Sequence, residues 1–229
     1  MRIGRPIAPA ALLLGTALLA AGCAGTPSPK HADAKSTPNG GATATAAPDT
    51  ATGPLNASDL QGRWWTWASS SPSGSNPVED RDGSMCAQGQ KDAGVWFLAG
   101  TFGERAKRTC AVPANRRLAF PLVNLMSDQA GCSEFMAPAK GTATLDGKPL
   151  RVARYDATPV RVTAEEGNPL TDGGGTFRTH ACGLWVQMEP LKPGNHTLEI
   201  RGSSGRFTVS VDYTLKVPAA GAATNHDAV

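Results

Sequence analysis

The most regular pattern of hydrophobic and polar positions lies near the C-terminus, in residues 207–217. Its apolar members are Phe207, Val209, Val211, Tyr213, Leu215 and Val217. Its polar members are Thr208, Ser210, Asp212, Thr214 and Lys216. Successive side chains of a strand point to opposite faces, so this alternation predicts a strand with one buried face and one solvated face.

Other segments predict short strands joined by turns. Residues 142–145 and 149–152 flank an Asp-Gly-Lys step, and Asp-Gly between two β-prone runs is a strong hairpin signal. Residues 184–188 predict a further strand, and a Pro-Gly-Asn turn leads into residues 196–201. The last third of the chain therefore predicts antiparallel strands.

The earlier part of the domain is less regular. Residues 95–100 form a compact apolar run typical of a buried strand, and residues 118–123 predict another. Pro121 places this second strand at a sheet edge or a bulge. Residues 60–67 fit either a short helix or an entry strand. Short strands between Gly, Pro and Asp turns predict a mainly β fold, a disulfide-stapled β-sandwich that is immunoglobulin-like or related.

The N-terminus has the pattern of an export signal. Arg2 and Arg5 precede an apolar run over residues 7–22. This run has about 16 residues, whereas a membrane-spanning helix needs about 20, so a signal peptide over residues 1–22 is favoured over an uncleaved anchor. Residues 23–57 are rich in Ala, Gly, Thr, Pro and Ser, which predicts a disordered tether with a reach of roughly 30 Å. The folded domain is expected at residues 58–217, followed by a disordered tail at 218–229.

Residues 19–23 read Leu-Ala-Ala-Gly-Cys. This segment resembles the bacterial lipobox, Leu-Ala-Gly/Ala-Cys, but it has Ala20 where the family most often has leucine. The resemblance implies cleavage before Cys23, a covalent diacylglycerol and an N-acyl chain on its sulfur and amine, and no other cofactor. It also implies a lipid-anchored position on the extracytoplasmic face of the cell membrane. More than one acyl chain is needed for durable anchoring.

Four cysteines remain once Cys23 is assigned to lipid: Cys86, Cys110, Cys132 and Cys182. An even number in an exported domain predicts two disulfides, for which three connectivities are open. The pairing of nearest neighbours, Cys86 with Cys110 and Cys132 with Cys182, is preferred. The absence of a Cys-x-x-Cys motif and the spacing of the cysteines argue against redox and zinc sites, so no metal is expected.

Few residue groups indicate chemistry. Trp64, Trp65 and Trp67 form a possible ligand surface, since exposed indole rings stack on sugars; the alternative is that they fill the core. His180 and His196 are expected to be structural, because no Gly-x-Ser-x-Gly elbow presents a serine. Residues 79–83 are expected to be a solvated turn rather than a calcium loop.

The charges are scattered. Lys and Arg total 22 against 19 Asp and Glu, which does not suggest nucleic acid as a partner. A basic neighbourhood could contact anionic lipid heads or wall polymers, or be an ordinary charged surface. Its members are Arg105, Lys107, Arg108, Arg116 and Arg117.

No catalytic constellation is apparent, so a non-enzymatic binding or regulatory role is expected. The chain resembles the small lipoproteins of high-GC actinobacteria through its signal, lipobox and Ala/Thr/Pro/Gly-rich tether. Among these it is similar to the lipoprotein of the Cse envelope-stress system. That likeness implies contact with a sensor-kinase ectodomain and negative modulation of a sigma-factor response. The alternatives are a module that binds cell-wall glycan through the Trp cluster, or a wall hydrolase.

Overall fold

A computed structural model describes residues 53–91 and 94–219. Cys23, the signal region, most of the expected tether and the end of the tail lie outside these residues. The described elements are, in chain order, α1 (Ala57–Ala68), β1 (Val95–Phe97), β2 (Arg105–Ala111), β3 (Arg117–Ser127), α2 (Gln129–Met136), β4 (Lys140–Leu145), β5 (Lys148–Pro149), β6 (Ala153–Ala164), β7 (Gly175–Met188), β8 (Gly194–Ser204) and β9 (Phe207–Val217).

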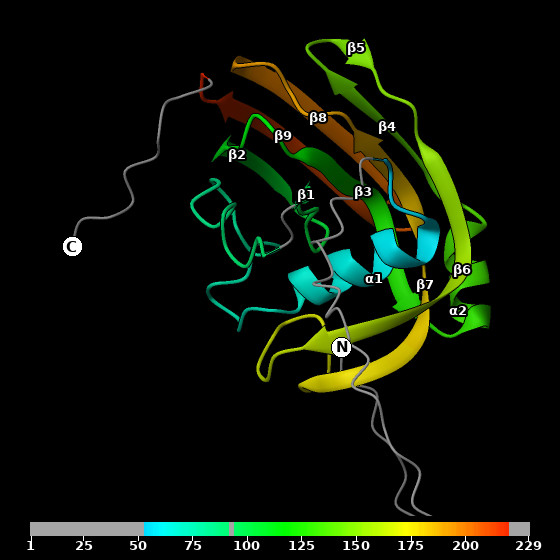
Figure 1. Cartoon of the computed structure of the whole chain (residues 1–229). Helices are drawn as coiled ribbons and strands as arrows, with labels where there is room; N and C mark the ends of the chain where they lie inside the picture. Colours follow the sequence, from blue (N-terminus) through cyan, green and yellow to red (C-terminus); the bar gives the residue numbers. More distant parts are fainter. Residues whose placement is uncertain (1–52, 92–93, 220–229) are drawn as a thin grey trace, which may run out of the picture. The chain divides into compact units, whose positions relative to one another are not determined.

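The strands form two sheets, which confirms the mainly β sandwich. The first sheet has the order β1-β3-β7-β6 and the second the order β2-β9-β8-β4-β5. The pairs β1–β3 and β2–β9 are parallel, and the other pairs are antiparallel. In Figure 1 α1 crosses the first sheet on the side away from the second sheet, so this sandwich carries a helical third layer.

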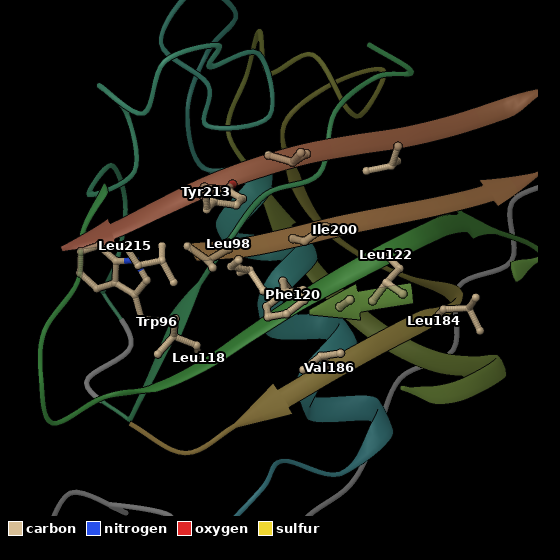
Figure 2. Packing of buried hydrophobic residues seen from close by; sticks show 14 of the residues in the cluster. Trp96, Leu98, Leu118, Phe120, Leu122, Leu184, Val186, Ile200, Tyr213 and Leu215 are labelled. Carbon is tan, nitrogen blue, oxygen red and sulfur yellow. The ribbon is translucent and has the colours of Figure 1, made fainter. Parts of the chain in front are cut away.

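The main core lies between the two sheets. Figure 2 shows Phe120 of β3 and Val186 of β7 on one side, facing Ile200 of β8 and Tyr213 of β9 on the other. The alternation predicted for residues 207–217 is confirmed, because Val209, Val211, Tyr213, Leu215 and Val217 are all buried while the polar positions between them are not.

A second core lies between the first sheet and α1. Phe97 of β1, Val162 of β6 and Trp185 of β7 pack there against Leu60 and Trp64 of the helix. The first sheet is therefore covered on both faces. This explains why the segments around β1 and β3 read as continuous apolar runs rather than as alternating ones.

Local turn chemistry agrees with the sequence. Asp146 and Gly147 have φ of 50° and 75°, and Leu145 pairs with Lys148, so the Asp-Gly step makes the expected hairpin with a two-residue turn. The strand after it is Lys148–Pro149 and not residues 149–152 as expected. The register of β3 shifts between Pro121 and Val123. Pro121 thus lies at a bulge inside the sheet and not at an edge.

Residues 60–67 belong to a helix and not to an entry strand. Asn56 is the N-cap of α1, and its side chain accepts a hydrogen bond from the Asp59 amide at 2.9 Å. Leu60, Trp64 and Trp67 follow at helical spacing and are buried. No helix among the described residues is long and apolar enough to cross a bilayer.

The domain begins earlier than the sequence suggested. Leu55 is only 9% exposed, and its backbone is hydrogen-bonded to the side chain of Gln187. The expected boundary at residue 58 is therefore wrong by three residues, because residues 55–57 belong to the fold and not to a tether. A single leucine among small residues gives no pattern, and its partner lies 132 positions away.

The structure contains two disulfides, Cys86–Cys110 and Cys132–Cys182, which is the pairing preferred from the sequence. The first joins the irregular segment of residues 69–91 to β2, and the second joins α2 to β7. On the chain-entropy model each cross-link stabilises the fold mainly by restricting the unfolded chain.

Candidate binding groove along the first helix

The Trp cluster fills the core, as the alternative had it, and does not form the possible ligand surface. Trp64, Trp65 and Trp67 are 2%, 8% and 5% exposed. The ring of Trp64 meets those of Trp65 and Trp185 edge-on, with centroids 5.2 and 5.7 Å apart. The Trp64 indole N–H donates to the Leu98 carbonyl at 3.0 Å. Their positions on α1 place these rings against the first sheet, so their faces are not open for stacking on a sugar.

A groove of about 550 Å³ runs along α1, within the size range of ligand pockets. One wall is α1 itself, the second is β6, and the third is the end of the segment at residues 69–91. The floor includes Trp67 and Phe97, which belong to the helix–sheet core. The sequence analysis did not anticipate this groove.

Side-chain hydroxyls of α1 join the helix to the backbone of β6. The Ser58 hydroxyl donates to the Pro159 carbonyl at 2.8 Å, and the Thr66 hydroxyl accepts from the Thr163 amide at 3.1 Å. Since β6 is an edge strand of the first sheet, these bonds cap backbone groups that another strand could otherwise pair with. They also fix the distance between two walls of the groove.

Gly62 lies midway between Ser58 and Thr66 and permits close approach. A Cβ at Gly62 would lie 3.1 Å from the Arg161 carbonyl oxygen. Four residues of a helix rise about 6 Å, and two residues of a strand rise about 6.6 Å. The three helix positions therefore lie opposite every second residue of β6, from Pro159 to Thr163. The Ser-Gly-Thr spacing of i, i+4 and i+8 is the sequence signal that could have indicated this contact.

The third wall belongs to a long segment without regular structure, described over residues 69–91. Asn76 holds its start, donating to the Ala68 and Ser71 carbonyls at 2.7 and 3.0 Å. Ser70, Gly89 and Lys91 from this segment line the groove. Loops of this length in compact domains are usually functional, which favours the groove as the binding site.

A buried arginine, Arg108, corrects two predictions. One placed Arg108 in a basic neighbourhood at the surface, and the other made residues 79–83 a solvated turn. Arg108 is 2% exposed and donates to the carbonyls of Asp80 and Ala99 and to the Tyr213 hydroxyl at 2.7, 2.9 and 2.8 Å. Asp80 is 4% exposed and accepts from the Gly83 amide at 2.9 Å, so residues 79–83 are not simply a solvated turn. Burial raises the pKa of Tyr213. This network ties the long segment to β2 and β9.

The rest of the basic neighbourhood does not form one surface. Arg116 lies over the Trp96 ring at 5.0 Å, and burial lowers its pKa. Arg117 forms an ion pair with Glu189 at 2.6 Å. Arg105 and Lys107 are exposed on β2. The five cations therefore occupy different environments, because successive residues of β2 face opposite sides of the sheet.

The groove carries charges of both signs and several hydroxyls. Its cations are Arg63, Lys91 and Arg161, and its acids are Asp59 and Glu165. Hydroxyls of Ser58, Thr66, Ser70 and Thr163 lie among them. The hydroxyls are hydrogen-bonded within the domain, so the charged side chains are the groups that suit a polar ligand or a protein surface bearing both charges.

Neither histidine of the domain lies in the groove. His196 Nδ1 is 2.8 Å from an Asp146 carboxylate oxygen, and its Nε2 is 2.9 Å from the Lys192 carbonyl. Both partners accept hydrogen bonds, so both ring nitrogens donate in the imidazolium form, and the Asp146 bond raises the pKa of His196. Neither nitrogen is then open to take a proton from a serine. His180 is half-buried on β7.

No protein-family model and no curated protein match this chain. Among solved structures it is similar to a family 123 glycoside hydrolase from Clostridium perfringens, described in a study of glycolipid glycan hydrolysis. The identity is 10% and the TM-score 0.23, over 57% of this chain and 24% of the other. The chain thus matches about a quarter of the enzyme's length, and this likeness carries nothing about reaction or ligand.

Proposed function

We propose that this chain is a lipid-anchored extracytoplasmic protein that acts without catalysis. It binds the ectodomain of a membrane sensor through the groove along α1 and so holds an envelope-stress system in its inactive state. The observation that carries the proposal is the groove itself, with its mixed charges and hydroxyls between α1, β6 and a long loop. A protein surface with charges of both signs fits this lining.

The groove lies at the point where the chain enters the domain. Leu55 is fixed against Gln187, and α1 starts directly afterwards. With a lipid on Cys23 and a flexible coil between Cys23 and Leu55, the root-mean-square distance between the lipid and the attachment point is roughly 30 Å. An ectodomain that stands close to the membrane is therefore within reach of α1.

Regulation by such contact requires preferential binding to one state of the sensor. A tenfold shift of the sensor's equilibrium needs about 1.4 kcal/mol of differential binding energy. A few charge-assisted hydrogen bonds from Arg161, Lys91 and Glu165 can supply this amount. A small groove is thus sufficient for modulation, and a large permanent interface is not needed.

Photo-crosslinking in intact membranes tests the proposal. A photoreactive residue replaces Arg161, which is exposed in the groove, and a control replaces Lys216, which is exposed on the second sheet. We expect the groove position, and not the control, to capture one membrane protein with an extracytoplasmic domain. Capture of wall glycan alone, or identical products from both positions, would contradict the proposal.

A reporter of the envelope-stress operon gives the second measurement. Arg161→Glu reverses a charge in the groove and should raise operon expression at an unchanged amount of protein. Lys216→Glu makes the same charge change elsewhere and should leave expression unaltered. If deletion of the whole gene leaves the operon unchanged, the regulatory role is wrong whatever the crosslinks show.

A further inference from the structure

A second hollow, of about 620 Å³, lies on the solvent face of the second sheet, apart from the groove. Residues of β2, β9, β8 and β4 line it. It contains the exposed Arg105 of the basic neighbourhood, together with Lys140, which the sequence did not connect with it. Neither the fold nor the proposed regulatory contact uses this hollow.

The charge balance of the hollow is positive. Within the described part of the chain, the side chains of Arg105 and Lys140 form no ion pair. The nearby acids face other cations: Glu104 pairs with Arg81 at 3.0 Å, and Arg201 lies 2.5 Å from Asp212 and 3.9 Å from Glu199. Arg105 and Lys140 are therefore the cations of the lining without an ion pair among the described residues, which favours an anionic ligand.

The strand register sets the spacing of these two cations. Arg105 pairs with Ser210, Ser210 with Arg201, and Arg201 with Thr142, so these four residues form one row across four strands. Strands lie about 4.8 Å apart, so the row is about 14 Å long. Lys140 lies two residues from Thr142, on the same face. At this backbone separation two linked phosphates of an extended polyanion can each contact one cation without drawing the two long side chains together.

The remaining lining residues narrow the ligand class. Four hydroxyls, those of Thr142, Ser203, Thr208 and Ser210, lie among the cations, and Val209 is the sole residue of the lining with a large apolar side chain. No aromatic ring lines the hollow, so neither base stacking nor insertion of an acyl chain is favoured. We propose that this hollow binds an extended polyanion with a hydroxylated backbone, namely a phosphodiester-linked polyol.

The probe for the test is a synthetic glycerol-phosphate oligomer, titrated into the full chain in non-ionic detergent at several salt concentrations. We expect saturable binding that weakens with salt, as contacts between cations and phosphates require. The double variant Arg105→Glu/Lys140→Glu should lower the affinity at least tenfold and make the salt dependence shallower. The neutral double variant Arg105→Gln/Lys140→Gln should give an intermediate loss.

The matched control is Lys148→Glu/Lys216→Glu, which makes the same charge change at exposed positions of the same sheet outside the hollow. It should keep at least half of the affinity. An equal loss in the control would overturn the proposal in favour of unspecific attraction. So would absence of binding, or tighter binding to poly-glutamate or to phosphatidylglycerol vesicles. Inorganic phosphate at the same phosphate concentration should compete at least tenfold more weakly, since separate ions lack the linked contacts of the oligomer.

Discussion

The side-chain amide of Gln187 forms two hydrogen bonds with the backbone of Leu55, accepting from its N–H at 2.8 Å and donating to its carbonyl at 2.9 Å. The amide thus pairs with Leu55 as a neighbouring strand would. Because α1 starts directly afterwards, this contact fixes the end of the domain to which the expected tether is joined.

Replacement of Gln187 by leucine should weaken the attachment of Leu55 to β7. The variant loses both hydrogen bonds, and we expect a decrease of about 1–3 kcal/mol in the free energy of unfolding. Amide hydrogen exchange at Leu55 should rise much more than exchange in β9. Gln88→Leu is the control, because Gln88 is exposed. Unchanged protection at Leu55 would show that the contact does not hold the chain.

Gly62 is predicted to be essential for the seating of α1 on β6. Gly62→Ala gains about 1 kcal/mol of helix propensity but brings a Cβ to 3.1 Å from the Arg161 carbonyl. That carbonyl cannot yield easily, since Ser58 and Thr66 hold β6 on either side of it. We therefore expect a net loss of about 1 kcal/mol in a denaturant titration.

Gly173→Ala is the control for Gly62, because a Cβ there meets no atom closer than 3.9 Å. Its effect should be within about 0.5 kcal/mol of zero. A stabilising Gly62→Ala would show that helix and strand can separate without loss, and the groove wall would then be less rigid than its contacts suggest.

Arg108 is expected to be the main attachment of the long segment to the sandwich. Arg108→Met removes a buried set of charge-assisted hydrogen bonds and leaves several carbonyls without a donor. We expect a loss of about 3 kcal/mol or more, and new protease cleavage within residues 69–91. Tyr213→Phe should cost about 1 kcal/mol, and the exposed Arg105→Met close to none. Equal effects of the two arginine variants would contradict this assignment.

The lipid anchor lies outside the described residues and stays a prediction from the lipobox. Cys23→Ser removes the sulfur that would carry diacylglycerol, and signal cleavage is expected to fail with it. We expect the variant to lose the fatty-acid label in metabolic labelling. We also expect the processed, membrane-bound form to disappear from the membrane sediment. Labelling and processed size identical to those of the wild type would remove the anchor and the proposed position at the bilayer.

Local sequence patterns predicted much of the fold but little of the candidate site. The alternation in β9 and the Asp146-Gly147 turn are set by neighbouring residues, and both were anticipated. Arg108 was not, because a cation between polar residues looks like surface until distant carbonyls surround it. The groove was missed for the same reason: its walls come from three segments, and the Ser-Gly-Thr spacing in α1 marks only the contact between two of them.

The pair of His196 and Asp146 should make stability depend on pH in two directions. The pKa of His196 is raised, chiefly by its hydrogen bond to Asp146, so its contribution is complete below the ordinary value of 6.5 and is lost as pH rises through the raised pKa. The pKa of Asp146 is lowered, chiefly by the same bond, so its contribution is present above 3.8 and is lost as pH falls.

The contribution of this pair to the free energy of unfolding should therefore be greatest between pH 3.8 and pH 6.5. Asp146→Asn removes the charge but keeps a side chain that tolerates the positive φ of the turn. In that variant the His196 pKa, followed by NMR, should fall toward 6.5, and the decline of stability above that pH should flatten. A His196 pKa that is the same in both proteins would show that the 2.8 Å contact does not hold the ring in its charged form.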